Sequence, residues 1–112
     1  MQDYIEKISR ALGLARRAGS LKAGTELVID SMRRGKALRI YISSQVSEAT
    51  LKKLKDKSAF YNVPAEIIDL SMDELAQRVG FTRPTAAVSL TDKNFLDLID
   101  KNKEKIICQL AK

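Results

Sequence analysis

Helical and strand-like patterns alternate along this chain, and that alternation limits its fold more than any other feature of the sequence. Apolar residues recur at helical spacing over residues 3–18. Runs rich in β-forming residues follow at 38–42, 65–69 and 85–90, with helical patterns between and after them. Such alternation favours a sheet with helices on both faces. The 112 residues are therefore predicted to form a single α/β domain over residues 1–112. We expect a three-layer α/β/α sandwich with a central mixed four-stranded sheet in which one strand is short.

Glycine and hydroxyl residues mark the predicted helix ends. Gly19 ends the first helix and Gly35 the second, because glycine adopts the left-handed conformation without a Cβ penalty. Ser47 is placed to cap a third helix, and Ser71 with Glu74 has the spacing of a capping box that starts a fourth. Gly80 is predicted to end the fourth helix, and Thr91 or Asp92 to cap a last helix. Leu21-Lys22 is predicted to be a short extended segment between the first two helices. The course of residues 101–112, with Ile106, Ile107 and Leu110, stays open between a longer last helix and a separate piece.

The joint between the first two helices carries the main candidate for a binding site. It reads Arg16-Arg17-Ala18-Gly19-Ser20-Leu21-Lys22-Ala23-Gly24-Thr25-Glu26. Gly24-Thr25 is placed to start the second helix, whose N-terminus would present unpaired N–H groups and a partial positive charge to an anion. Arg16, Arg17 and Lys22 stand close to it in the sequence. We interpret this end as a site for an RNA backbone, although a joint with a few cations is more often only a solvated connection.

The charge of the chain favours a polyanionic partner. The formal net charge is +6, and residues 1–39 hold nine Lys or Arg against four Asp or Glu, which is a net of +5. Basic domains of this kind are typical of proteins that bind nucleic acids. A second basic run, at Lys52, Lys53, Lys55 and Lys57, falls on the outer side of the third predicted helix. We interpret that run as a solvated helix face.

The residues that most enzymes need are missing. The sequence holds no histidine and one cysteine, Cys108, so it offers no usual acid–base partner for a nucleophile and a poor ligand set for zinc. The stretch from Gly19 to Thr25 resembles a P-loop, but no lysine stands between Gly24 and Thr25, and the stretch follows a predicted helix instead of a strand. We therefore expect no enzyme activity, no cofactor and no metal. No apolar run approaches the roughly 20 residues of a membrane span, so we expect a cytoplasmic protein.

Several segments together resemble one protein family. They are Leu12-Gly13-Leu14-Ala15-Arg16-Arg17-Ala18-Gly19, Gly24-Thr25-Glu26, Arg83-Pro84-Thr85-Ala86-Ala87-Val88 and Thr91-Asp92-Lys93-Asn94-Phe95. In this order and spacing the chain is similar, over about residues 4–100, to the ribosomal protein L7Ae/L30e family, with the small bacterial YlxQ-like proteins as the nearest branch. The resemblance implies an α/β/α sandwich that binds structured RNA, often kink-turns, in ribosomes or related particles.

The resemblance also implies where RNA would bind. In that family RNA meets the N-terminus of the second helix and the loop before the last strand. These places match Gly24-Thr25-Glu26 and Thr82-Arg83-Pro84-Thr85 here. The predicted RNA-binding residues are therefore Arg16, Arg17, Lys22, Gly24, Thr25, Glu26, Thr82, Arg83, Pro84 and Thr85. The expected partner is a structured RNA such as ribosomal RNA, with ribosomal or ribosome-assembly proteins as further partners, and the chain is expected to be a monomer.

The chain departs from the family at the residues that read the RNA. Kink-turn binders of this family typically carry Gly-Thr-Asn-Glu-x-x-Lys, with polar side chains on tandem sheared G·A pairs. Here Glu26, Leu27 and Asp30 stand in those places. Leu27 has no group that can hydrogen-bond a base, and Asp30 reverses the charge of the lysine. We therefore expect weak binding of a standard kink-turn, or a preference for a variant RNA with a loop or bulge.

Two functions remain open from the sequence. In the first, the protein is a noncatalytic RNA-binding protein, ribosomal or ribosome-associated, in which cations hold phosphates while Thr25 and Glu26 face the edges of splayed bases. In the second, it is a protein-interaction module on the same fold, whose acidic helix start at Glu26 and Asp30 meets a protein. The dependence of affinity on salt separates the two, because phosphate contacts release counterions.

Overall fold

The computed structural model describes residues 2–99, with side chains from Tyr4 onward. The labelled elements are α1 (Gln2–Arg17), β1 (Leu21–Ala23), α2 (Thr25–Arg33), β2 (Arg39–Ser43), α3 (Glu48–Phe60), β3 (Ala65–Ile68), α4 (Met72–Val79) and β4 (Ala87–Leu90). A last helix begins at residue 93. This order agrees with the predicted one. The questions left open about residues 101–112, with Cys108 among them, lie outside the described residues.

The four strands form one mixed sheet in the order β1-β4-β2-β3. The pair β2–β3 is parallel, whereas β4 runs antiparallel to both β1 and β2. The strand β1 has three residues and is the short strand that the sequence predicts. It pairs with β4 in the register Lys22 opposite Ser89. Because β4 lies beside β1, the loop that leads into β4 is brought near the joint between α1 and α2.

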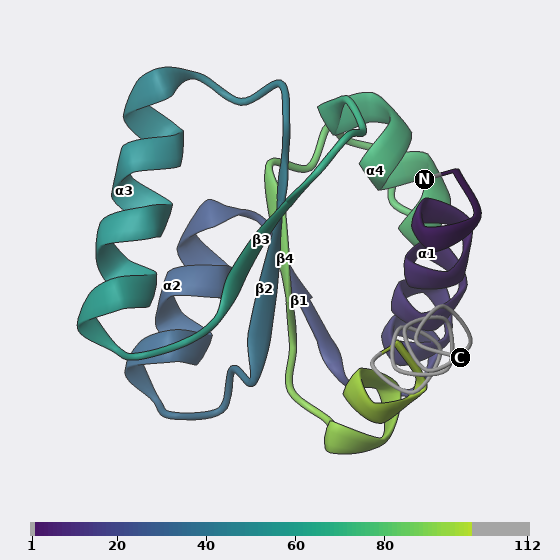
Figure 1. Ribbon diagram of the computed structural model, residues 1–112, viewed down its shortest axis with the longest axis horizontal. Coiled ribbons are helices and arrows are strands. Elements are labelled where there is room, and N and C mark those ends of the chain that lie inside the picture. The colour runs from purple at the N-terminus through teal and green to yellow at the C-terminus, as the bar shows by residue number, and fades with distance from the viewer. Residues whose placement is uncertain (1, 100–112) are drawn as a thin grey trace, which may run out of the picture.

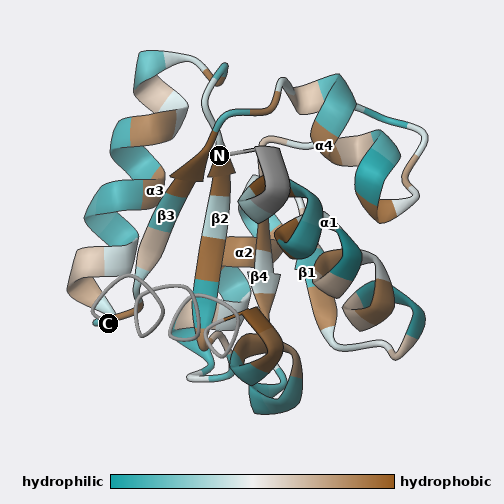
Figure 2. Ribbon diagram, turned by 45° about the vertical axis from the view of Figure 1, so that its right-hand side comes forward, coloured by the Kyte–Doolittle hydropathy of each residue, from teal (hydrophilic) through white to brown (hydrophobic). Residues whose placement is uncertain are grey.

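Helices cover both faces of the sheet, so the predicted three-layer sandwich is confirmed. The helices α2 and α3 lie on one face, and α1, α4 and the last helix lie on the other (Figure 1). Each face has its own apolar core. One core holds Ile8, Leu12, Tyr41, Leu75 and Leu90 among others, and the second holds Val28, Met32, Ile40, Ile42 and Leu54 among others. Hydrophobic residues fill much of β2 and β3, while hydrophilic residues dominate the outer sides of α1 and α3 (Figure 2).

The predicted helix ends are formed by the predicted residues. The Ser47 side chain accepts a hydrogen bond from the Thr50 amide at 3.2 Å. Ser71 and Glu74 form both hydrogen bonds of a capping box, at 3.0 and 3.1 Å. Gly80 ends α4 with a φ of 86°, in the left-handed region that favours glycine. Local sequence therefore determines where α3 and α4 begin and where α4 ends.

Candidate functional site

The start of α2 and the loop before β4 enclose one small hollow. Its volume is about 240 Å³, and its lining consists of Ala23, Gly24 and the loop residues Phe81, Thr82, Arg83, Pro84 and Thr85. The Gly24 amide donates a hydrogen bond to the Ala87 carbonyl oxygen at 2.9 Å, which ties the start of α2 to the first residue of β4. The predicted closeness of these two segments, which are about 60 residues apart in the sequence, is confirmed.

The N-terminus of α2 differs from those of α3 and α4 in how it is capped. Gly24 is the N-cap, with a φ of 98°, and no side chain caps this end. The first helical hydrogen bond runs from the Val28 amide to the Gly24 carbonyl oxygen at 2.9 Å. The amides of the first turn therefore face the surroundings with the positive end of the helix dipole behind them. A negatively charged group beside Gly24 would meet both.

Arg16 and Phe81 connect the end of α1 to the loop. The Arg16 guanidinium carbon lies 4.6 Å from the centre of the Phe81 ring, a cation–π contact. A Cβ on Gly80 would lie 3.2 Å from an Arg16 nitrogen, so the guanidinium packs closely over the glycine that ends α4. The sequence does not mark Phe81 as a site residue, and the only signal for it is an aromatic residue next to the Arg83-Pro84 pair. Arg16 thus positions the loop as well as adding charge to it.

The loop residues differ in how they could meet a ligand. Thr82, Arg83 and Pro84 are exposed. Thr85 is only 5% exposed, its hydroxyl donates to the Arg83 carbonyl oxygen at 3.2 Å, and its amide donates to the Met72 carbonyl oxygen at 3.1 Å. The role of Thr85 as a direct RNA contact stays a prediction, and the burial of its side chain favours a structural role in the loop. Its side chain holds the loop in shape, and the exposed residues before it present the surface.

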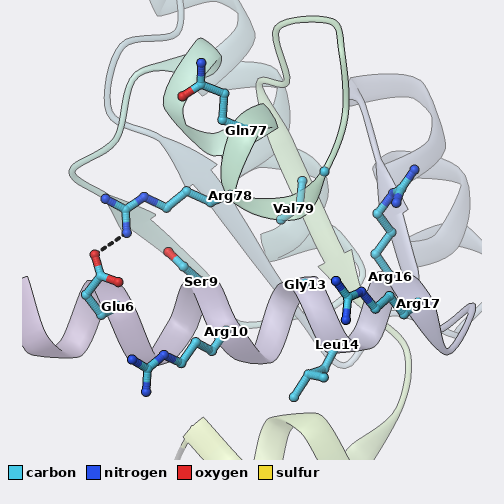
Figure 3. A pocket seen from close by; sticks show the side chains of 11 residues that line it. Glu6, Ser9, Arg10, Gly13, Leu14, Arg16, Arg17, Gln77, Arg78 and Val79 are labelled. Carbon is cyan, nitrogen blue, oxygen red and sulfur yellow. Dashed lines mark hydrogen bonds and ion pairs between the residues drawn. The ribbon is translucent and has the colours of Figure 1, made fainter.

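The three predicted cations of the joint do not form one cluster. Arg16 and Arg17 line a groove of about 810 Å³ between α1 and α4 (Figure 3). Lys22 lines a separate hollow of about 340 Å³, together with Leu27, Asp30, Arg34 and Lys36 among others. The small hollow at Gly24 is thus flanked by two basic surfaces. A long ligand could contact both, whereas a single phosphate could not.

The hollow at Lys22 combines cations with one exposed apolar side chain. Leu27, in the first turns of α2, is 55% exposed. Asp30 accepts hydrogen bonds from Arg33 at 2.5 Å and from Arg34 at 2.8 Å. The hydrogen bond from Arg33 is the main reason that the pKa of Asp30 is lowered. Two guanidinium groups therefore offset the charge of Asp30.

Glu26 lies at the surface and is paired across two helices. Its side chain is 84% exposed, and its carboxylate lies 3.2 Å from the Lys53 ammonium of α3. An exposed pair of this kind is worth only about 0–1 kcal/mol, so a ligand could displace Lys53 at little cost. The lysine run of α3, interpreted above as a solvated helix face, thus reaches the candidate site through Lys53. Thr25, beside Glu26, is half-buried.

The described residues meet the requirements of neither a metal site nor a membrane-spanning helix. Residues 2–99 hold no group of three or more His, Cys, Asp or Glu side chains placed to bind a metal ion. None of the helices described there is both long and apolar enough to cross a membrane.

Known proteins resemble this chain in sequence and in structure. It is 38% identical to an Enterococcus faecium protein named RNA-binding protein YlxQ over 101 residues, which cover 90% of this chain and 92% of that protein. It is 33% identical to the Bacillus subtilis (strain 168) protein of the same name over 84 residues, which cover 75% and 82%.

Two solved structures share its fold. A Bacillus halodurans protein of unknown function matches with a TM-score of 0.71 and 28% identity, over 84% of this chain and 96% of that one. The Giardia lamblia 15.5kD RNA binding protein matches with a TM-score of 0.78 over 95% and 89%, and at 16% identity this second likeness concerns the fold alone. The model of the ribosomal protein L7Ae/L30e/S12e/Gadd45 family matches residues 6–100, in agreement with the resemblance seen in the sequence. This chain therefore belongs to the ribosomal protein L7Ae/L30e/S12e/Gadd45 family.

Proposed function

We propose that this protein is a noncatalytic RNA-binding protein that recognises a structured RNA at the start of α2 and the 81–85 loop. The observation that carries the proposal is the hollow shared by Gly24 and that loop, with an N-terminus of α2 that no side chain caps. Relatives at 38% and 33% identity are named RNA-binding proteins. The proposed partner is a ribosomal RNA segment with a kink-turn-like bend, a loop or a bulge.

The phosphate backbone is proposed to lie against Gly24, where amides of the first turn of α2 and the helix dipole favour an anion. A Cβ on Gly24 would meet no atom within 4 Å, so the space beside this backbone is open. Arg83 on the loop and Arg16 and Arg17 at the end of α1 supply positive charge on one side, and Lys22 supplies it on the other. These contacts hold the RNA but carry no information about its sequence.

Specificity is proposed to come from Glu26. A carboxylate accepts hydrogen bonds from the imino and amino groups of guanine, and Glu26 is exposed at the first turn of α2. Leu27 offers no hydrogen bond, and Asp30 is already bonded to Arg33 and Arg34. Two contacts typical of kink-turn binders are therefore missing, and we expect a standard kink-turn to be bound weakly compared with a variant RNA.

The competing function is a protein-interaction module at the same helix start. The exposed Leu27 favours this function, because an apolar side chain can anchor a protein partner but forms no favourable contact with an RNA phosphate. A protein partner would bind with a weak dependence on salt. An RNA partner would show a steep one, because each phosphate contact contributes about 0.7–0.9 to the slope of log affinity against log salt.

A titration with three RNAs tests the proposal: a standard kink-turn, the same RNA without its G·A pairs, and a plain duplex. Wild type is compared with Glu26→Ala and with the control Glu48→Ala, which removes an exposed first-turn carboxylate from α3 instead. We expect wild type to prefer the bent RNAs over the duplex, and Glu26→Ala to lose discrimination more than affinity. Equal, weak and salt-independent binding of all three RNAs by wild type would contradict the RNA function. Tight binding of the standard kink-turn that Glu26→Ala leaves unchanged would contradict only the role of Glu26.

A further inference from the structure

The groove between α1 and α4 is the largest of the three hollows described here, and the proposed function does not explain it. Its lining includes four arginines, Arg10, Arg16, Arg17 and Arg78, and one carboxylate, that of Glu6. Figure 3 shows these side chains along α1 and on the facing α4. Four positive groups and one negative group give a net of +3 for the ionisable side chains that line the groove.

Only one of the four arginines that line the groove forms an ion pair with a carboxylate of the groove. Glu6 forms an ion pair with Arg78, which joins the two helices at one end (Figure 3). Arg10 and Arg17 are exposed and form no ion pair among residues 4–99. The two helices are in contact near Gly13, where a Cβ would lie at an ordinary van der Waals distance, 3.5 Å, from the Arg78 carbonyl oxygen. The groove is thus basic, and most of its positive charge is not offset by an ion pair among the described residues.

The groove continues into the proposed RNA site. Arg16 lines it and also stacks on Phe81, which belongs to the lining of the hollow at Gly24. Arg10 and Arg17 are seven residues apart on α1, which corresponds to about 10 Å along the helix. One strand of a DNA duplex places a phosphate about every 3.4 Å along its axis, and on that scale the distance from Arg10 to Arg17 spans several phosphates of a stem. Guanidinium groups suit phosphates because their N–H donors pair with two oxygens at once.

We propose that the α1–α4 groove binds the phosphate backbone of a stem of the same RNA, where that stem leaves the site at Gly24 and the 81–85 loop. This inference rests on the proposed function and assigns a second contact surface to it. An acidic peptide is the weaker candidate. Of the large apolar side chains in the lining, Leu14 is exposed and Val79 is buried, so a protein partner would find few anchors. The groove therefore adds affinity and orientation without adding sequence specificity.

The test compares three kink-turn RNAs: one with two short stems, and two in which one or the other stem is lengthened by a helical turn. The groove variant is Arg10→Ala/Arg78→Ala. One control is Lys52→Ala/Lys55→Ala, which removes the same charge from the exposed face of α3. The second control is Glu6→Gln, which breaks the ion pair to Arg78 but keeps every arginine, so that a folding effect of losing this pair would appear there too.

We expect wild type, Lys52→Ala/Lys55→Ala and Glu6→Gln to bind one lengthened RNA more tightly than the short one. The groove variant should lose that gain, and its salt slope on the long RNA should fall by about 1.4–1.8, the share of two phosphate contacts. A groove variant that keeps the gain and the slope would overturn the inference while the proposed function stands. A poly-glutamate peptide that binds wild type but not the groove variant, with RNA binding equal in both, would overturn it in favour of an acidic protein partner. If wild type bound none of these RNAs, nor a variant RNA with a loop or a bulge, both proposals would be wrong.

Discussion

The substitution Gly24→Ala should affect both the stability of the protein and its affinity for RNA, and the two effects can be measured separately. Gly24 has a φ of 98° and a ψ of 147°, close to a region of backbone space that only glycine occupies readily. A Cβ there would meet no atom within 4 Å, so the substitution causes strain without a clash. Strain of this kind costs about 1–3 kcal/mol. For a domain of this size we expect a fall in Tm of about 4 °C per kcal/mol.

The added methyl group would also stand where the RNA backbone is proposed to approach. Hydrogen bonds to charged groups are worth about 1.5–3 kcal/mol, so the loss of one amide–phosphate bond weakens binding about ten- to a hundredfold. Gly35→Ala is the matched control, because Gly35 has a φ of 72° and open space around it but lies at the far end of α2. Its strain should cost about 1–2 kcal/mol.

Two measurements decide the outcome. Thermal unfolding checks that both variants fold and are destabilised to a similar extent. Titration with a kink-turn RNA, well below both melting temperatures, should then show the loss of affinity in Gly24→Ala but not in Gly35→Ala. Equal affinities of the two folded variants would refute the claim that RNA approaches the protein at Gly24.

Three further predictions concern single side chains. Tyr4 donates a hydrogen bond to Glu66 at 2.9 Å, and burial raises the pKa of the Tyr4 hydroxyl above that in the unfolded chain. The protonated hydroxyl therefore stabilises the fold fully below about pH 10, and this stabilisation is lost as the pH rises above about 10. Tyr4→Phe should therefore lose less stability than wild type between about pH 9 and pH 11 in urea unfolding, and parallel losses would contradict this. In the wild type the buried hydroxyl groups of Ser31 and Ser89 are hydrogen-bonded at 2.8 Å, so Ser31→Ala leaves the Ser89 hydroxyl without this bond. In chemical denaturation, Ser31→Ala should lower the free energy of unfolding by about 1–3 kcal/mol, and by more than the double variant Ser31→Ala/Ser89→Ala does. Arg83→Ala should weaken binding of all three RNAs alike and lower the salt slope by about 0.7–0.9, and a selective loss on one RNA would show that Arg83 reads bases instead.

The fold was predictable because its signals are local. Ser47, Ser71 with Glu74, and Gly80 mark helix ends through bonds within a few residues of each other, and the structure forms each of them. The sheet order needed more, because the pairing of β1 with β4 joins segments far apart in the sequence. The family resemblance supplied that closeness, and no periodicity in the chain indicates it.

The candidate site was predictable in outline but not in its charge pattern. Arg17 and Lys22 are five residues apart, yet they line separate hollows, because α1 packs against α4 whereas β1 lies near α2. The pair between Glu26 and Lys53 depends on the packing of α2 against α3, which the sequence does not reveal. The pairing of Asp30 with the arginines three and four positions later follows from helical spacing, so its signal was present in the sequence.

The central claim is that RNA meets this protein at the start of α2 and the 81–85 loop, and mapping backbone amide resonances during an RNA titration tests it most directly. A kink-turn RNA added to the labelled protein should shift the amides of residues 24–27, 81–83 and 85 first and most strongly; Pro84 has no amide hydrogen. Smaller shifts should follow along α1 if the groove takes part. Shifts confined to α3, around Lys52 to Lys57, with the amides of residues 24–27, 81–83 and 85 unchanged, would contradict the claim.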